Sequence, residues 1–251
     1  MFWRFRIGRL AATTLVLLPF APLATEAQVP DKFTNLQYFP TTIPRQELIG
    51  NMRRFSFSLG VRCQFCHVLK DDKTGLTDFA SNEKDTKRTA LAMLRMVDAI
   101  NQDYIAKMGR TLPIRVECVT CHHQLSMPKT MHALLAETID KKGIQAAIDL
   151  YRDLRKKDLA NGQYDFGETS LNILTESLLK QDKPREAVAI MELNVEVNTP
   201  PSGWAYSLLA MSHVANKEVE KARADYQRIL ERNPDDEWAK KQLEQLNAGK
   251  P

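Results

Sequence analysis

Apolar residues in the first half of the chain recur at the spacing of a helix. Between Pro44 and Gly60 they follow one another at i, i+4, i+7 and i+11, which places them on a single stripe. Pro44 suits the first position of a helix and Gly60 suits the position after its end. This segment is therefore predicted to be one amphipathic helix, whose stripe consists of Leu48, Met52, Phe55 and Leu59.

A second amphipathic helix is predicted farther along the chain. Ser81 or Asn82 can cap its start, it runs to about Lys107, and Gly109 stands just past its end. The alternation over residues 111–117 that follows allows a short strand. The apolar face of this helix consists of Met93, Met96, Val97, Ile100 and Tyr104.

The second half of the chain is predicted to form short helices separated by turn residues. Their apolar positions repeat after about 35 residues, with a small residue followed by an aromatic one, and this pattern resembles tetratricopeptide repeats, helix pairs that stack into a solenoid. A plain helical bundle is the alternative. The predicted helices span residues 143–157, 166–180, 184–197, 204–215, 218–232 and 235–246.

The repeat places one histidine in its core. Leu171, Leu174, Leu178, Ala187 and Met191 recur as Tyr206, Leu209, His213, Ala222 and Tyr226. His213 is therefore expected to be packed rather than to bind a metal. Residues 143–165 are expected to form a degenerate leading pair, and the last helix to close the array.

The opening 27 residues have the pattern of a secretory signal peptide. Three arginines precede an apolar segment at residues 10–24, and Thr25-Glu26-Ala27 is a suitable cleavage site, so Gln28 is the expected first mature residue. The apolar run is short for a membrane span and is interrupted by two prolines. An uncleaved membrane anchor is the alternative to a periplasmic or otherwise extracytoplasmic protein.

All four cysteines of the chain lie in two copies of one motif, Cys63-Gln64-Phe65-Cys66-His67 and Cys118-Val119-Thr120-Cys121-His122. C-x-x-C-H is the attachment sequence of c-type haem: the two thiols add to the porphyrin vinyl groups, and the histidine reaches the iron. The sequence therefore predicts two covalently bound haem c groups. Export agrees with this, because c-type haem is attached outside the cytoplasm.

Two other uses of these cysteines remain as alternatives. The pairs are separated widely enough to form one four-thiolate zinc site, but the histidine after each pair would then have no role. A thiol-redox C-x-x-C expects a thioredoxin-like βαβ pattern nearby, and the flanks here are predicted to be helical.

The iron of an electron-transfer cytochrome usually takes a second axial ligand, commonly methionine or histidine. Met52 lies in the middle of the first helical stripe, where a methionine is more often a core residue. His123 adjoins a proximal histidine and is expected to be structural. His132, on the helix that follows Pro128, is the candidate for ligation by two histidines.

The arrangement of a methionine-bearing helix followed by C-x-x-C-H resembles the cytochrome c subunit of photosynthetic reaction centres. The resemblance covers about residues 31–128, and this chain has one pair of such haem units. It implies that a helical methionine is the sixth iron ligand in each unit and the motif histidine the fifth. The segments that carry the resemblance are Asn35-Leu36-Gln37, Met93-Leu94-Arg95-Met96, Ala99-Ile100-Asn101 and residues 116–122.

Carried over by position, the resemblance pairs Met52 with His67 at the first haem iron and Met96 with His122 at the second. Met93 is the fallback for Met96, because it lies one turn earlier on nearly the same face. The duplicated unit implies a local pseudo-twofold axis. Five arginines near the motifs are candidates to pair with haem propionates, of which one or two are expected to do so: Arg53, Arg54, Arg62, Arg110 and Arg115.

The predicted fold is all-α, with a signal peptide at residues 1–27, a dihaem cytochrome domain at 28–140 and a tetratricopeptide-like solenoid at 141–251. The formal charge of +4 includes three arginines and one glutamate of the leader, which leaves +2 for the mature chain, so there is no electrostatic footprint for nucleic acid.

The leading functional prediction is an exported dihaem electron carrier rather than a substrate-converting enzyme. The repeats would dock redox partner proteins, a membrane electron-transfer complex among the candidates. A dihaem peroxidase-like enzyme and a haem-based sensor, each with one open iron site, are the alternatives.

Overall fold

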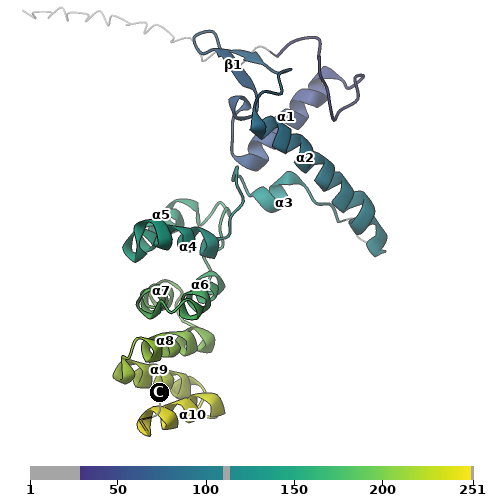
Figure 1. The fold of residues 1–251 in the computed structure, drawn as a ribbon. Coiled ribbons are helices and arrows are strands. Elements are labelled where there is room, and N and C mark those ends of the chain that lie inside the picture. Colours follow the sequence, from purple (N-terminus) through teal and green to yellow (C-terminus); the bar gives the residue numbers. More distant parts are fainter. Residues whose placement is uncertain (1–28, 110–113, 250–251) are drawn as a thin grey trace, which may run out of the picture. The chain divides into compact units, whose positions relative to one another are not determined.

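The computed structural model describes residues 29–109 and 114–249 (Figure 1). The predicted signal peptide with its cleavage site at Gln28, the side chain of Arg110, and the first part of the predicted strand lie outside the described residues. The chain divides into two compact units. One consists of the chain up to Arg45 with Cys63–Leu94, and the other of Gln46–Arg62 with the chain from Arg95 onwards.

The first predicted helix is confirmed as α1, Arg45–Leu59. Pro44 directly precedes it, and Gly60 ends it in the left-handed region, at φ 65°. The predicted stripe faces inwards, with Leu48 buried and Met52 half-buried.

A β-hairpin follows the first cysteine motif and was not predicted from the sequence. After the 3-10 turn η1, Cys63–Phe65, the chain forms β1, Val68–Asp71, and β2, Leu76–Asp78. The strands are antiparallel, with Val68 opposite Asp78 and an irregularity between Leu69 and Asp71. These strands are too short, and too irregular in register, to produce a period-2 signal in the sequence.

The second predicted helix is confirmed as α2, Asp85–Ala99, which continues through the π-helical turn η2, Ile100–Tyr104, and the 3-10 turn η3, Ile105–Met108. Gly109 ends it in the left-handed conformation. The predicted caps at its start, Ser81 and Asn82, are wrong. The hydroxyl of Ser81 accepts from the backbone N–H of Glu83 at 3.1 Å, and the helix begins later, where the carbonyl of Lys84 accepts the first backbone bonds.

The short helix α3, Cys118–His122, contains the second motif. Residues 114–117 before it are not a strand, so the predicted strand is absent from that described part of the segment. Backbone pairing there is replaced by a side chain, as described below.

The rest of the chain is a stack of helix pairs, α4 with α5, α6 with α7 and α8 with α9, closed by α10 (Figure 1). The fold is therefore all-α apart from the hairpin, and the predicted solenoid is confirmed. The helices are α4 (Met131–Lys142), α5 (Ile144–Asp158), α6 (Glu168–Lys180), α7 (Pro184–Val197), α8 (Gly203–Ala215), α9 (Val219–Arg232) and α10 (Glu237–Asn247).

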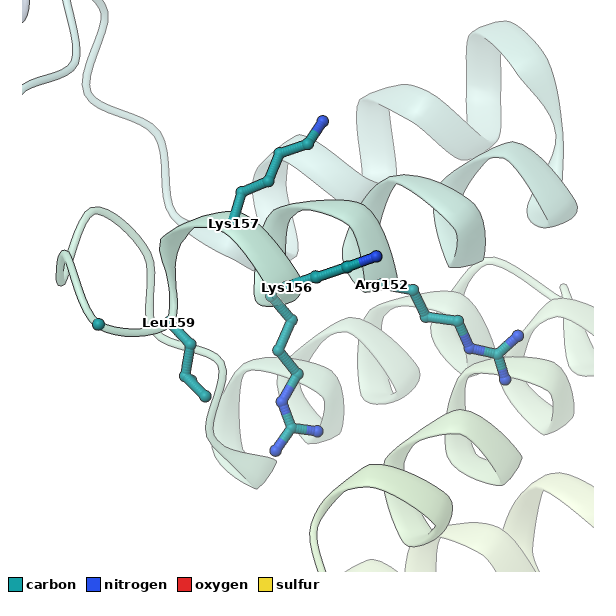
Figure 2. Close-up of a pocket in the computed structure, with 6 residues that line it drawn as sticks. Arg152, Lys156, Lys157 and Leu159 are labelled. Carbon is teal, nitrogen blue, oxygen red and sulfur yellow. The ribbon is translucent and has the colours of Figure 1, made fainter. Parts of the chain in front are cut away.

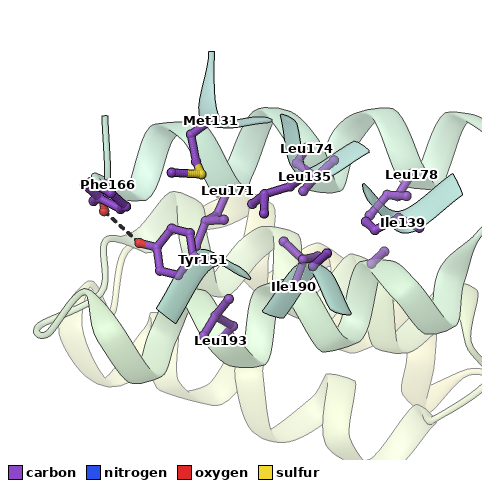
Figure 3. Close-up of a cluster of buried hydrophobic side chains, with 12 residues drawn as sticks. Met131, Leu135, Ile139, Tyr151, Phe166, Leu171, Leu174, Leu178, Ile190 and Leu193 are labelled. Carbon is purple, nitrogen blue, oxygen red and sulfur yellow. Dashed lines mark hydrogen bonds between the residues drawn. The ribbon is translucent and has the colours of Figure 1, made fainter. Parts of the chain in front are cut away.

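The leading pair starts earlier than the sequence indicated. Met131, Leu135 and Ile139 of α4 are buried in one cluster with Tyr151 and Leu171 (Figure 3). Tyr151 also donates its hydroxyl to the carbonyl of Phe166 at 2.9 Å. The apolar face of α4 thus completes the first repeat, and the exact boundary placed at residue 140 stays a prediction.

The predicted repeat core is confirmed at its small and aromatic positions. Ala187 and Ala222 are fully buried, and Tyr226 is 1% exposed. His213 is 4% exposed, and its Nδ1 lies 2.7 Å from Oδ2 of Asp225. It is packed in the core, as the repeat pattern predicts. No helix within residues 29–109 and 114–249 is long and apolar enough to cross a bilayer.

Candidate haem sites

The first cysteine motif forms a single helical turn. The backbone N–H groups of Cys66 and His67 donate to the carbonyl of Cys63, at 3.2 and 3.0 Å. Residues spaced by three and four on such a turn share one face. The two thiols, both free, and the imidazole therefore lie on the same side of the turn, as thioether attachment with histidine ligation requires.

The imidazole of His67 is suited to bind a metal. Burial lowers the pKa of His67 to about 4, and the charge of Lys87 acts in the same direction. The nearby backbone of Phe79 raises the pKa and so partly offsets this shift. Nδ1 of His67 is buried and has no hydrogen-bond partner among the described residues. The ring of Phe79 lies edge-on, with its centroid 5.0 Å from that of the imidazole. Because a histidine binds metal in its neutral form, His67 is ready to do so at neutral pH.

The second motif occupies α3, and a hydrogen bond orients its histidine. Nδ1 of His122 lies 2.7 Å from the carbonyl oxygen of Leu125. A carbonyl can only accept, so in the neutral imidazole Nδ1 carries the proton and Nε2 keeps its lone pair. This is the arrangement in which the second ring nitrogen fixes the tautomer of a metal-binding histidine.

Asn101 holds the connector that leads into the second motif. Its Nδ2 donates to the carbonyl of Val116 at 2.8 Å, and its Oδ1 accepts from the N–H of Val116 at 2.8 Å. The side-chain amide thus makes both bonds that a neighbouring strand would make. Asn101 lies in the π-helical turn, a local widening that is frequent at functional sites.

The methionine candidates differ in exposure. Met93 and Met96 are 42% and 47% exposed on α2, a face that is open to a ligand, whereas Met52 is half-buried on the inward-facing stripe of α1. The spacing of these methionines does not by itself choose between Met93 and Met96. Assignment of Met52 and Met96 as iron ligands stays a prediction.

The other histidines have local roles. His123 is exposed and ends α3 in the left-handed conformation. Nε2 of His132 lies 3.1 Å from the hydroxyl of Thr130, the residue that caps α4. His213 is already paired with Asp225 in the repeat core.

The described segment before α4 has little protein core of its own. Ile43 and Leu48 are its only buried apolar residues, and α2 has no buried residue although it is amphipathic. Burial of apolar surface is the main driving force of folding, so a segment this size requires another apolar body. A porphyrin fits that role. The large apolar side chains left exposed include Phe57, Phe65, Leu76, Met93, Met96, Tyr104 and Met108.

At the start of α2, a group of side chains that was not predicted from the sequence donates to backbone carbonyls of the first motif and of the segment of Phe79. The ammonium of Lys87 donates to the carbonyls of Phe79, Ala80 and Ser81 at 2.8, 3.2 and 2.9 Å. Thr86 donates its hydroxyl to the carbonyl of Phe65 at 2.6 Å, and Lys84 donates to that of Gln64. One signal was present in the sequence, because lysines at a helix N-terminus oppose the macrodipole and so need nearby acceptors.

Among the arginines proposed to meet propionates, Arg54 donates to the side chain of Asn51. Arg53, Arg62 and Arg115 are exposed, and none has an ion pair within the part of the chain described here. These three have guanidinium groups available for an anion.

Residues 42–138 match the family model of the photosynthetic reaction centre cytochrome C subunit. This part of the chain is similar to reaction centre cytochromes. The match covers both motifs and both methionine helices, and it implies haem of the c type.

Two curated relatives agree. Cytochrome c-554 of Chloroflexus aurantiacus is 32% identical over 114 residues, which is 42% of this chain and 25% of that protein. The photosynthetic reaction center cytochrome c subunit of Thermochromatium tepidum is 30% identical over 123 residues, 45% of this chain and 29% of that protein. The chain thus spans little more than a quarter of the length of the relatives it matches.

Two solved structures overlap 47% of the chain at 20% identity. They are the first TPR of Spaghetti (RPAP3) bound to an HSP90 peptide, with a TM-score of 0.34, and the first TPR domain of human RPAP3, with a TM-score of 0.33. They are covered over 89% and 87% of their lengths.

Proposed function

We propose that this chain is an exported dihaem c-type cytochrome that carries electrons, with one haem on each C-x-x-C-H motif. The observation that carries the proposal is the local geometry of both motifs, each of which has two free thiols and an imidazole on one helical turn. Bound haem supplies one-electron chemistry; the protein sets its potential through axial ligands and burial.

Residues of this chain would perform the positioning. Cys63, Cys66, Cys118 and Cys121 would hold the two porphyrins, while Met52 with His67 and Met96 with His122 would bind the two irons. Two protein ligands on each iron would leave no position for a substrate, and this favours electron transfer over peroxidase-like catalysis or gas sensing. The predicted signal peptide supports export to the periplasm, with anchoring if the signal is retained.

An optical redox titration of the purified holoprotein tests this function. We expect two low-spin haems with reversible one-electron midpoints and no rapid binding of carbon monoxide to the ferrous protein. Rapid carbon monoxide binding at one haem would instead support the peroxidase-like or sensor function, because it requires an open or easily vacated iron position.

We further propose that the repeats dock a protein redox partner through a basic patch at the end of α5. The patch consists of Arg152, Arg155, Lys156 and Lys157 around a hollow that also contains Leu159 and Ala160 (Figure 2). Arg155, Lys156 and Lys157 lie in the last turn of α5, where cations also complement the carbonyl end of the helix, and Arg152 extends the patch one turn further back.

Most of the charge of the basic patch is not neutralised. Arg152 pairs with Glu196 at 2.7 Å, but Arg155 donates to the backbone carbonyl of Val197 at 2.9 Å, which orients it without cancelling its charge. Lys156 and Lys157 are exposed and form no ion pair with a described residue. An acidic face on the partner is the complementary surface, and it would speed association at low salt.

Charge reversal at Lys156 tests the docking surface. With a fluorescein-labelled octaglutamate peptide as probe, Lys156→Glu should weaken binding severalfold at low ionic strength, and added salt should remove the difference. Lys241→Glu, the same change at an exposed residue of α10, is the matched control. Equal losses in both variants would mean that net charge alone acts. Trp204 is 44% exposed on the apolar face of α8. If Trp204→Ala impaired capture of the redox partner and Lys156→Glu did not, docking would lie on that face.

A further inference from the structure

The loop after the second motif is built against the end of α1. His123 and Gln124 both have positive φ, 47° and 64°, an unusual conformation for residues with a side chain. The N–H of Gln124 donates to the carbonyl of Ser58 at 2.9 Å. A Cβ at Gly60, whose φ is +65°, would lie 2.1 Å from the carbonyl oxygen of Gln124. Only glycine therefore permits this close approach.

This contact reaches the second histidine directly. The N–H of Leu125 donates to the carbonyl of His122 at 2.7 Å, and the carbonyl of Leu125 holds Nδ1 of His122 at 2.7 Å. The position of the loop thus fixes the imidazole. The helix that supports the loop, α1, also contains Met52, the methionine predicted for the first haem.

The converse contact holds the first motif. Thr86 and Lys84, at the start of α2, donate to the carbonyls of Phe65 and Gln64, which are the two residues between Cys63 and Cys66. Lys87 secures the segment of Phe79, whose ring packs against His67. The helix that provides these donors, α2, contains Met96, the methionine predicted for the second haem.

We propose that the two haem sites are built reciprocally: the helix that bears the methionine of each site positions the attachment segment of the other. This inference rests on the proposed function of two haems with methionine ligands. A disturbance at the end of α1 should therefore reach the loop that holds His122, and a disturbance at the start of α2 should reach the first motif. Ser58, Gly60, Lys84 and Thr86 are thus positioning residues.

Two variants test the reciprocity, with both haems counted first by pyridine haemochrome. Thr86→Val keeps the shape of the side chain and removes the donor to Phe65. It should shift the midpoint of the first haem, or raise its high-spin fraction, and leave the second unchanged. Thr89→Val, at an exposed residue one turn later in α2, is the control. The midpoint retained by a Cys121→Ala protein identifies the first haem.

Gly60→Ala should have the opposite selectivity. Its Cβ displaces the loop that holds His122, so the second haem should change although Gly60 lies closer in sequence to the first motif. Gly162→Ala introduces a side chain at a similar φ, +68°, with nothing within 4 Å of the new Cβ, and controls for backbone strain.

The haem count and the midpoints distinguish failure of the proposed dihaem function from failure of the reciprocal positioning. A haem count below two overturns the proposed function and this inference together. A count of two with Thr86→Val acting on the second haem, or with neither midpoint moved, overturns only the reciprocal positioning. If Gly60→Ala does not fold, the Thr86→Val result decides alone.

Discussion

Cys121→Ala is expected to lower the haem content of the protein from two per chain towards one. Cys121 supplies one of the two thioether bonds at the second site, and it lies on the same face of α3 as Cys118 and His122. Loss of this thiol should abolish or severely impair attachment there, while the first motif, a separate turn with its own thiols, remains intact. Pyridine haemochrome absorbance relative to protein mass measures the change.

Val119→Ala is the control for Cys121→Ala, because it truncates a side chain inside the same motif without removing a thiol. The control should retain both haems. Stoichiometric zinc with no haem in the unmodified protein would overturn the haem interpretation. An unchanged haem content in Cys121→Ala would mean that the second motif does not depend on this thiol to attach a haem.

Met96→Ala is expected to lower one of the two midpoint potentials and to remove half of the weak absorption near the red end of the ferric spectrum. That absorption arises from methionine sulfur on low-spin ferric iron, and methionine with histidine gives a higher potential than two histidines. Met96 is 47% exposed on the open face of α2, so its removal should not cost the protein a packed core residue. A redox titration with optical spectra records both effects.

Met108→Ala is the matched control, since Met108 is 57% exposed in the turn that extends the same helix. An unchanged spectrum in Met96→Ala would transfer the ligand role to Met93 or His132. Met93→Ala and His132→Ala would then be compared in the same titration, and the variant that loses half of the band would identify the ligand.

The helices of the repeats could be predicted closely from sequence because their signals are local. Leu171, Leu174 and Leu178 share one face by their spacing alone, and Pro184 and Gly143 mark where helices begin or end. The predicted ranges agree with those of the six helices α5 to α10 to within two residues at either end. The leading helix pair starts earlier than predicted, at α4, because the surface on α5 and α6 that buries the apolar face of α4 lies in later sequence.

The chemistry of the sites was also largely present in the sequence. C-x-x-C-H encodes its own turn, so the relation of Cys63, Cys66 and His67 follows from the helical spacing. What held these turns in place could not be read in this way. Thr86 and Lys84 donate to carbonyls that lie 21 and 20 residues earlier in the chain. Backbone carbonyls carry no sequence signature.

The sequence by itself thus determined the all-α class, the repeat period, both attachment motifs and the ends of most helices, because each depends on residues within one or two turns of each other. The tertiary structure alone decided the hairpin of β1 and β2, the clamp of Asn101 on Val116, and the fit of Gly60 against Gln124. The hairpin is local but its strands are too short and irregular to give a periodic signal, whereas the other two contacts join segments separated by loops. Their geometry depends on where the chain returns in space, which periodicity does not specify.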